Sequence, residues 1–170
     1  MCILIVKPQG AKVPPLQTLK NCALRNNHGF GYATAQDEYK TLDFDEFTAK
    51  VSEIKDEEAA IIHLRYATHG SICTANCHPF RDYATGVAFA HNGVLSIIAD
   101  HDKTDSETAF RSLFVPKIEQ YGLFSRALTQ AVNRVIGASK FAFIDREGNI
   151  KTFGRFIEFD GCYYSNYQFL

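Results

Sequence analysis

The chain has 170 residues, 46% of them hydrophobic and 22% charged, and its formal net charge is −1. This composition predicts a single globular domain over residues 1–170 and excludes an intrinsically disordered chain. The balanced charge argues against nucleic-acid binding over the whole surface, and the apolar runs are far shorter than the ~20 residues of a membrane-spanning helix, so neither partner is expected.

Cysteine usage and the N-terminal sequence both indicate the cytoplasm. Residues 1–8 have neither the basic region nor the full apolar region of a secretory signal peptide. The chain has five cysteines, an odd number, and without a signal peptide these are expected to be reduced thiols. We therefore expect a cytoplasmic protein without structural disulfides.

Apolar runs and amphipathic stripes predict strands first, then helices, then strands again. Residues 2–6 form a short apolar run typical of a strand that is buried on both faces. A helix is expected around 16–23, a strand from Tyr32, a helix at 43–55, strands at 59–64 and 86–90, helices at 106–114 and 124–135, strands at 141–144 and 150–153, and a hairpin of 156–159 with 162–167. This order predicts an α+β fold in which helices cover antiparallel sheets.

Cys2 is the first residue with a distinctive chemical option. A small second residue allows an aminopeptidase to remove Met1, and Cys2 would then carry both a thiol and a free α-amine. That amine has an unperturbed pKa of about 7.7–8.0, so near neutral pH it can take the thiol proton directly or through water. The alternative is a small core residue at the start of a strand, and for Cys2 alone that interpretation is favoured.

Two segments at the ends of predicted strands carry polar groups suited to binding a small substrate. In 63–70, Arg65 comes near the end of a strand, where an arginine can hold a carboxylate with two hydrogen bonds. In 91–93, the Asn92 side-chain amide and the Gly93 backbone amide could form an oxyanion hole. Each segment also has a plain structural interpretation, as a salt-bridged surface arginine and as a type I′ hairpin turn.

The segment Thr104-Asp105-Ser106-Glu107 has the pattern of a helix N-terminus. Thr104 or Asp105 would cap the helix expected at 106–114. An aspartate at this place could also hold the ammonium group of a substrate.

Five motifs in this order resemble the glutaminase domain of the class II glutamine amidotransferases, which are N-terminal-nucleophile hydrolases. They are Cys2, His63-Leu64-Arg65-Tyr66-Ala67-Thr68-His69-Gly70, His78-Pro79-Phe80, His91-Asn92-Gly93 and Thr104-Asp105-Ser106-Glu107. The resemblance covers residues 2 to about 115 by motif, and the last third of the chain by strand pattern only. It is closest to the small free-standing members of the family, which lack a synthase domain.

The resemblance implies a four-layer αββα sandwich of two antiparallel sheets flanked by helices. It implies that Cys2, with its own α-amine as the base, attacks the glutamine side-chain amide and forms a γ-glutamyl thioester. The remaining implied roles are oxyanion stabilisation by Asn92 and Gly93, binding of the α-carboxylate by Arg65 with Thr68 and His69, binding of the α-ammonium by Asp105, and a place near the entrance loop for His78. No metal or other cofactor is implied.

Three features depart from the family pattern. Ile3 stands where glycine usually follows the nucleophile, and Tyr66 stands where tryptophan is frequent. In 25–31, Arg25 and Gly31 match a glycine-rich pocket segment of the family, but its aspartate is missing. In addition, a retained Met1 would tie up the α-amine of Cys2. The alternatives are therefore hydrolysis of another γ-glutamyl amide, or a non-catalytic binding or regulatory protein on the same fold.

A metal site is the rival interpretation for the segment that follows Arg65. It holds residue types that zinc prefers, namely Cys73, Cys77 and His78, with His63 and His69 nearby. The three-residue gap between the cysteines is unusual for zinc, and no second cysteine pair follows. We therefore expect Cys73 and Cys77 to be loop residues. Cys22 and Cys162 are expected to pack in the core.

The sequence indicates a glutamine-using domain without the machinery that would use the ammonia. No glycine-rich phosphate loop occurs in the chain. Larger members of the family pass ammonia to a second active site on the same chain. The resemblance therefore implies glutamine as the small-molecule substrate and a separate synthase, or another acceptor-bearing protein, as the partner.

Overall fold

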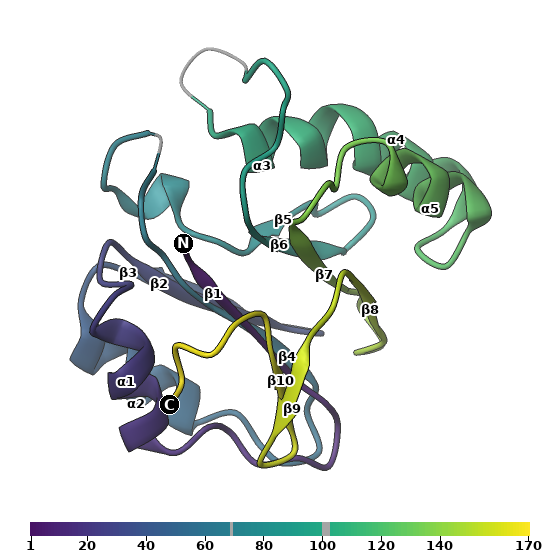
Figure 1. Ribbon diagram of the computed structural model, residues 1–170. Coiled ribbons are helices and arrows are strands. Elements are labelled where there is room, and N and C mark those ends of the chain that lie inside the picture. The colour runs from purple at the N-terminus through teal and green to yellow at the C-terminus, as the bar shows by residue number, and fades with distance from the viewer. Residues whose placement is uncertain (69, 100–102) are drawn as a thin grey trace.

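The computed structural model describes residues 1–68, 70–99 and 103–170, and its strands form two antiparallel sheets (Figure 1). The larger sheet contains β1 (Ile3–Lys7), β2 (Phe30–Thr34), β3 (Glu38–Thr41), β4 (Ala60–Leu64), β9 (Ile157–Phe159) and β10 (Cys162–Tyr164), in the order β3-β2-β4-β1-β10-β9. The smaller sheet contains β5 (Phe80–Arg81), β6 (Ala88–Asn92), β7 (Lys140–Ile144) and β8 (Ile150–Phe153), in that order.

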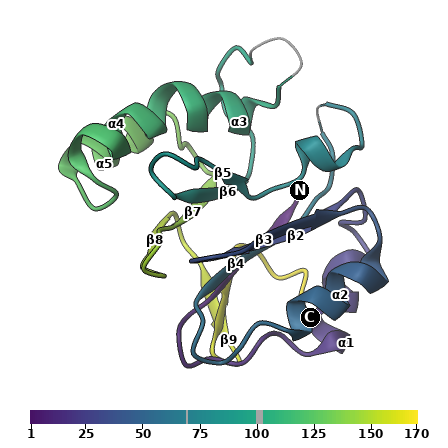
Figure 2. The same cartoon turned by 180° about the vertical axis from the view of Figure 1, so that it is seen from behind.

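Helices cover the outer face of each sheet (Figures 1 and 2). The larger sheet is covered by α1 (Leu16–Ala23) and α2 (Phe44–Ser52), whose buried residues join the apolar cluster of that sheet. The smaller sheet is covered by α3 (Asp105–Ala109), a π-helical segment (Phe110–Phe114), α4 (Val115–Tyr121) and α5 (Arg126–Asn133). A short 3₁₀ helix (Thr74–Asn76) precedes β5. None of the helices in the described ranges is long and apolar enough to cross a bilayer.

β1 lies in the middle of the larger sheet and is buried on both faces. Ile3 and Ile5 pack toward α1 and α2, whereas Leu4 and Val6 pack between the two sheets. Successive side chains of a strand point to opposite faces, so a strand covered on both sides needs apolar residues at every position. This accounts for the continuous apolar run at the start of the chain.

The layer between the sheets is built largely from alanine. Small side chains of the smaller sheet at Ala88, Ala90 and Ala142 meet aliphatic ones of the larger sheet, among them Leu4 and Ile61. The bulky rings of the smaller sheet, such as Phe89, instead face the helices. The molecule thus has four layers, in the order helices, larger sheet, smaller sheet and helices, with an apolar cluster between each neighbouring pair. The expected αββα sandwich is confirmed.

The differences from the expected elements have local causes. The sequence does not predict β3, β5 or α4, the first two being short and the last containing Pro116. That proline lies in the first turn of α4, where a missing N–H costs nothing. Asn92-Gly93 is not a hairpin turn, because β6 pairs with β5 and β7, neither of which follows it directly. β10 ends at Tyr164, three residues before the expected end.

The alanine layer predicts a strong dependence on side-chain size. Ala90→Leu should lower the free energy of unfolding by about 1–3 kcal/mol, because Ala90 is fully buried between two sheets that would have to separate. Ala138→Leu, at an exposed loop position, is the matched control and should change stability by less than about 0.5 kcal/mol. Urea unfolding measures both, and equal effects would contradict the packing described here.

Candidate active site

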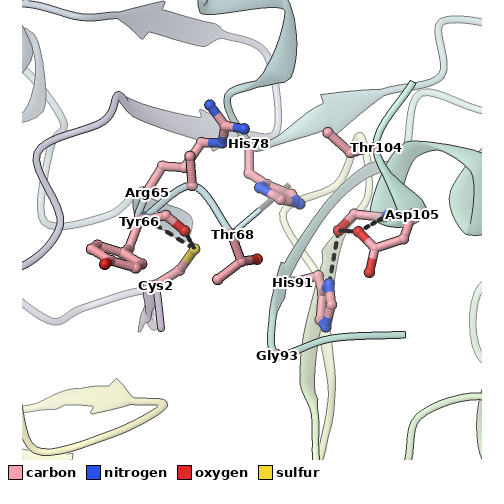
Figure 3. A pocket seen from close by; sticks show the side chains of 11 residues that line it. Cys2, Arg65, Tyr66, Thr68, His78, His91, Gly93, Thr104 and Asp105 are labelled. Atoms are coloured by element: carbon pink, nitrogen blue, oxygen red, sulfur yellow. Dashed lines mark hydrogen bonds between the residues drawn. The ribbon is translucent and has the colours of Figure 1, made fainter. Parts of the chain in front are cut away.

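Three strand ends meet at one edge of the sandwich. Ile3 pairs with Leu64 in antiparallel register, so Cys2 and Arg65 follow at the same edge of the larger sheet. β6 of the smaller sheet also ends here, just before Gly93. A pocket at this edge is lined by residues from all three strand ends, the following loops and the start of α3 (Figure 3): Cys2, Arg65, Tyr66, Ala67, Thr68, His78, His91, Gly93, Thr104, Asp105 and Ser106.

The Cys2 thiol lies against the backbone of Tyr66. The Tyr66 N–H donates to Cys2 Sγ over 3.3 Å, and the thiol donates to the Tyr66 carbonyl over 3.4 Å. Burial raises the pKa of the thiol and outweighs the Tyr66 amide and the Arg65 charge, both of which favour the thiolate. The thiol is therefore protonated at neutral pH, and its activation as a nucleophile requires a base.

His28, which the sequence does not single out, holds the loop under the thiol. Its Nδ1 accepts a hydrogen bond from the Ala67 N–H at 2.9 Å. Its ring stacks on that of Tyr66, with the centroids 5.1 Å apart. The only indication in the sequence was the position of His28 within 25–31, the segment that partly matches the pocket segment of the family.

Two glycines in the same segment allow close backbone packing. A Cβ at Gly31 would collide with the His78 carbonyl oxygen, and one at Gly29 would collide with the Cys77 sulfur. At Gly29 the backbone φ is also +138°, which L side chains rarely adopt. This segment therefore supports one wall of the pocket through its glycines and His28, without the aspartate of the family pattern.

Arg65 is buried beside the pocket and is anchored to the loop that follows it. Its Nη1 donates to the Ser71 carbonyl over 3.0 Å, and Asn76 Nδ2 donates to the same oxygen over 3.1 Å. The Arg65 side chain is thus a cation at the pocket wall with only 3% of the residue exposed. An anionic group of a ligand would find a strong partner there.

Asp105 is oriented by three donors at the start of α3. Its Oδ1 accepts from the backbone N–H and the hydroxyl of Ser106, over 2.7 and 3.2 Å, and its Oδ2 accepts from the Leu95 N–H over 2.9 Å. The cap of α3 is Thr104, whose hydroxyl oxygen accepts from the Glu107 N–H. Asp105 therefore provides a fixed carboxylate in the pocket wall. It lies across the pocket from Cys2 and Arg65 (Figure 3).

Ser106 connects Asp105 to a histidine. The Ser106 hydroxyl oxygen lies 2.8 Å from His91 Nδ1. The hydroxyl has one proton, which it donates to Asp105, so His91 Nδ1 must donate to the Ser106 oxygen. This chain of hydrogen bonds fixes the neutral tautomer of His91. The sequence highlighted His91 only as part of a motif and Ser106 only as part of a helix cap.

Three buried imidazoles pack together at the pocket, two of them in its lining. The ring centroids of His63 and His78 are 4.3 Å apart, and those of His78 and His91 are 6.3 Å apart. Burial lowers the pKa of His63 to about 3 and that of His91 to about 4, and it lowers the pKa of His78 well below its usual value. All three rings are therefore neutral at pH 7, and His63 Nε2 donates to the His91 carbonyl at 3.0 Å.

His78 belongs to the pocket wall rather than to an exposed entrance. It is 5% exposed, and neither ring nitrogen has a hydrogen-bond partner in the described part of the chain. Burying a donor and an acceptor without partners is costly. The His78 ring therefore offers both a donor and an acceptor to an occupant of the pocket.

Asn92 lies directly behind the pocket and does not line it. Its Nδ2 donates to the Ser165 hydroxyl over 2.8 Å. Gly93 does line the pocket, and its φ of +145° together with the closeness of Ser139 excludes a side chain at this position. Six of the expected site residues thus meet in one pocket: Cys2, Arg65, Thr68, His78, Gly93 and Asp105. His69, which was also expected there, lies outside the described residues.

The cysteine- and histidine-rich segment does not form a metal site among the residues that the structure places. No group of three or more His, Cys, Asp or Glu side chains is arranged to hold an ion there. Cys77 is buried and its thiol donates to the Cys73 carbonyl. Cys22 and Cys162 are fully buried, as expected.

Comparison with known proteins agrees with this geometry. The family model described as "Glutamine amidotransferases class-II" matches residues 30–153. The chain is 27% identical over 152 residues to a glutamine–fructose-6-phosphate aminotransferase (isomerizing) of Bacteroides thetaiotaomicron, and 35% identical over 89 residues to the Methanococcus maripaludis enzyme of that name. These matches cover 78% and 48% of this chain, but only 25% and 14% of the two relatives.

Solved structures support the same fold. Glutamine phosphoribosylpyrophosphate amidotransferase from B. subtilis, in a complex with ADP and GMP, superimposes with a TM-score of 0.59 at 19% sequence identity. The superposition covers 96% of this chain and 41% of that one. The sandwich described above is therefore a fold already seen as part of a longer chain.

The imidazole cluster predicts that stability falls on mild acidification. Histidines in the unfolded chain have a pKa near 6.5, whereas the three buried rings resist protonation, so the unfolded state binds more protons below that pH. The free energy of unfolding is fully retained above about pH 7 and should drop by about 4 kcal/mol per pH unit near pH 5.5.

Urea unfolding between pH 7.5 and 5 measures this slope. In His63→Gln, which removes one of the three groups, the slope near pH 5.5 should be reduced by about a third. A wild-type stability that stays constant from pH 7 to 5.5 would show that the cluster takes up protons in the folded state.

Proposed function

Because the chain belongs to the class II glutamine amidotransferases, an enzyme family, we propose that it hydrolyses the side-chain amide of glutamine to glutamate and ammonia, with Cys2 as the nucleophile. The observation that supports this most directly is the pocket, in which a thiol, a buried arginine and an oriented carboxylate lie together. Glutamine presents the matching groups: an amide, an α-carboxylate and an α-ammonium.

The raised pKa of the Cys2 thiol makes a base necessary, and the proposed base is the α-amine that removal of Met1 would expose. The amine takes the thiol proton, and the Tyr66 N–H, which already points at the sulfur, stabilises the thiolate. The sulfur attacks the amide carbon. As the tetrahedral intermediate collapses, the C–N bond breaks and the ammonium returns its proton to the leaving ammonia.

The remaining thioester is hydrolysed by water, with the same α-amine as the base. Both tetrahedral intermediates carry a negative oxygen that needs donors. The proposed donors are the Gly93 N–H at the pocket wall and the Asn92 side-chain amide behind it. One Asn92 N–H is committed to Ser165, so the second hydrogen of that amide would serve the oxyanion.

Substrate binding requires the pocket to open. Its free space is about 30 Å³, which admits water but not an amino acid. In this structure Arg65 Nη1 donates to the Ser71 carbonyl. We propose that the α-carboxylate of glutamine replaces this carbonyl as the acceptor while residues 70–77 shift. Asp105, with its three fixed donors, would hold the α-ammonium, and the two free nitrogens of His78 would face the bound amino acid.

The partner is proposed from the same comparisons. The chain spans about a quarter or less of the two aminotransferases described above, whose names include an acceptor for the nitrogen. We propose that ammonia released at Cys2 is used by a separate synthase or another acceptor-bearing protein.

The nucleophile is tested by Cys2→Ala. We expect loss of glutamate release with unchanged urea unfolding, because the thiol makes only two weak contacts with one neighbour. Intact-mass spectrometry of the active wild-type protein should show that Met1 is absent. Fully active protein that retains Met1 would overturn the amine as the base, and near-normal activity of Cys2→Ala would overturn the nucleophile. Absence of glutamate release from the wild-type protein would favour the alternative interpretation of a non-catalytic role on this fold.

Cys73 provides the matched control for labelling. A hydrogen bond from Ser71 lowers the pKa of the Cys73 thiol, whereas burial raises the pKa of the Cys2 thiol. A general thiol reagent should therefore modify Cys73 first. A glutamine analogue with an electrophilic side chain should instead label Cys2, and Cys73→Ala should leave this labelling and glutamate release unchanged.

The role of Arg65 is tested by Arg65→Lys. Lysine keeps the charge but loses the planar pair of donors, so the KM for glutamine should rise about 10- to 150-fold while kcat changes less. Steady-state kinetics with Arg134→Lys, an exposed arginine at the C-terminal end of α5, is the control. An unchanged KM in Arg65→Lys would show that this arginine serves only to anchor the loop at Ser71.

A further inference from the structure

A second hollow adjoins Cys2 and Asn92 but is not part of the pocket described above. Its volume is about 330 Å³, and its lining comes from the start of β7, the β8–β9 connection, β9 and the segment that follows β10. It is lined by Lys140, Arg155, Ile157, Ser165, Asn166 and Tyr167. Nothing in the proposed hydrolysis uses this hollow.

The charge of the lining is entirely positive. Two of the six residues are cationic and none carries a carboxylate, although the whole chain has a net charge of −1. Lys140 Nζ donates to the Ala138 carbonyl over 3.1 Å. The guanidinium of Arg155 is exposed and has no hydrogen bond or ion pair within the described residues. Such an arginine can bind an oxyanion through two parallel hydrogen bonds.

The floor of the hollow supplies a buried donor. Ser165 is 3% exposed, and its hydroxyl oxygen accepts from the Leu4 N–H over 2.9 Å and from Asn92 Nδ2 over 2.8 Å. With both lone pairs occupied, the hydroxyl proton remains to be donated, and no acceptor for it is present in the described residues. The buried side chain can satisfy this donor through an anion in the hollow.

The rim supplies apolar contact for the rest of a ligand. The ring of Tyr167 is largely exposed, at 66%, and Ile157 is half-buried. An exposed aromatic ring beside a cationic pair suits an organic molecule with one anionic end better than it suits a bare inorganic ion. Asn166 fixes this rim, since its Nδ2 donates to the Cys2 carbonyl over 2.8 Å.

We propose that this hollow binds a small organic molecule through a phosphate or carboxylate group, which Lys140, Arg155 and the Ser165 hydroxyl hold. The bound group would contact Ser165, whose hydroxyl accepts a hydrogen bond from Asn92. It would also lie beside Asn166, which donates to the Cys2 carbonyl. The inference is independent of the proposed hydrolysis, because none of the groups that bind the anion takes part in the reaction.

Binding is tested by titrating glucose 6-phosphate, gluconate and glucose into ¹⁵N-labelled protein. We expect at least one of the two anions to bind, with the largest amide shifts at residues 140, 155 and 165–167, and glucose to bind at least tenfold more weakly. The first two probes distinguish a phosphate from a carboxylate as the anionic group. No binding by either anion up to 10 mM, or equal binding of glucose, would overturn the proposal.

Variants identify the site. Arg155→Gln and Lys140→Gln should each weaken binding of the anion about tenfold, since each removes a charge-assisted hydrogen bond. Arg134→Gln is the matched control, an exposed arginine outside the hollow, and it should not change the affinity. An equal loss in all three variants would indicate unspecific attraction by surface charge and overturn the site. Repeating the titration on Cys2→Ala, which should bind equally well, separates this result from the success or failure of the proposed reaction.

Discussion

The antiparallel pairing of β1 with β4 is the constraint on which the site depends. The register that places Ile3 opposite Leu64 leaves Cys2 and Arg65 as the next residues at the same sheet edge. A slip of one residue would turn Leu4 and Val6 toward the helices and Ile3 and Ile5 toward the other sheet, so the packing on both faces of β1 would have to change. The core packing thus fixes the position of the thiol relative to the arginine without any direct bond between them.

Polar groups at the pocket are kept in a single state by burial. His63, His78 and His91 are neutral because charging them would be costly in this environment, and the hydrogen bonds to Ser106 and to a backbone carbonyl set the tautomers of two of them. Among the described residues that line the pocket, Arg65 and Asp105 are the charged groups beside these neutral rings. Such an arrangement favours a molecule with separated positive and negative groups, such as an amino acid.

Much of this architecture was readable from local sequence patterns. The signals that predict these elements lie in consecutive residues. Examples are the apolar run at 2–6, the apolar stripe of α2 and the paired strands near the C-terminus. What the sequence could not predict depends on contacts between distant segments. β3 has three partly buried positions followed by one buried position and hence no clear alternation, and β5 has two residues. His28 supports Ala67 across 39 positions, and no local pattern marks it.

The candidate site shows the same division. Arg65 and Asp105 could be proposed from motifs, because their chemistry resides in their own side chains. The placement of Asn92 behind the pocket could not, because it depends on Ser165, which is 73 positions away. The segment at 73–78 was a metal candidate in the sequence. The structure shows that the Cys77 thiol donates to the Cys73 carbonyl and that Arg65 donates to the Ser71 carbonyl.

The binding of the segment after β10 to the start of β1 has a consequence for biosynthesis. The Leu4 amide and the Cys2 carbonyl find their partners at Ser165 and Asn166, and the second of these is 164 positions further along the chain. During translation the Cys2 end therefore lacks its final contacts until nearly all of these residues have been made. Throughout that interval the Met1–Cys2 peptide bond is open to processing enzymes, and the site closes around Cys2 only afterwards. The fold thus leaves time for the proposed removal of Met1 before the pocket assembles.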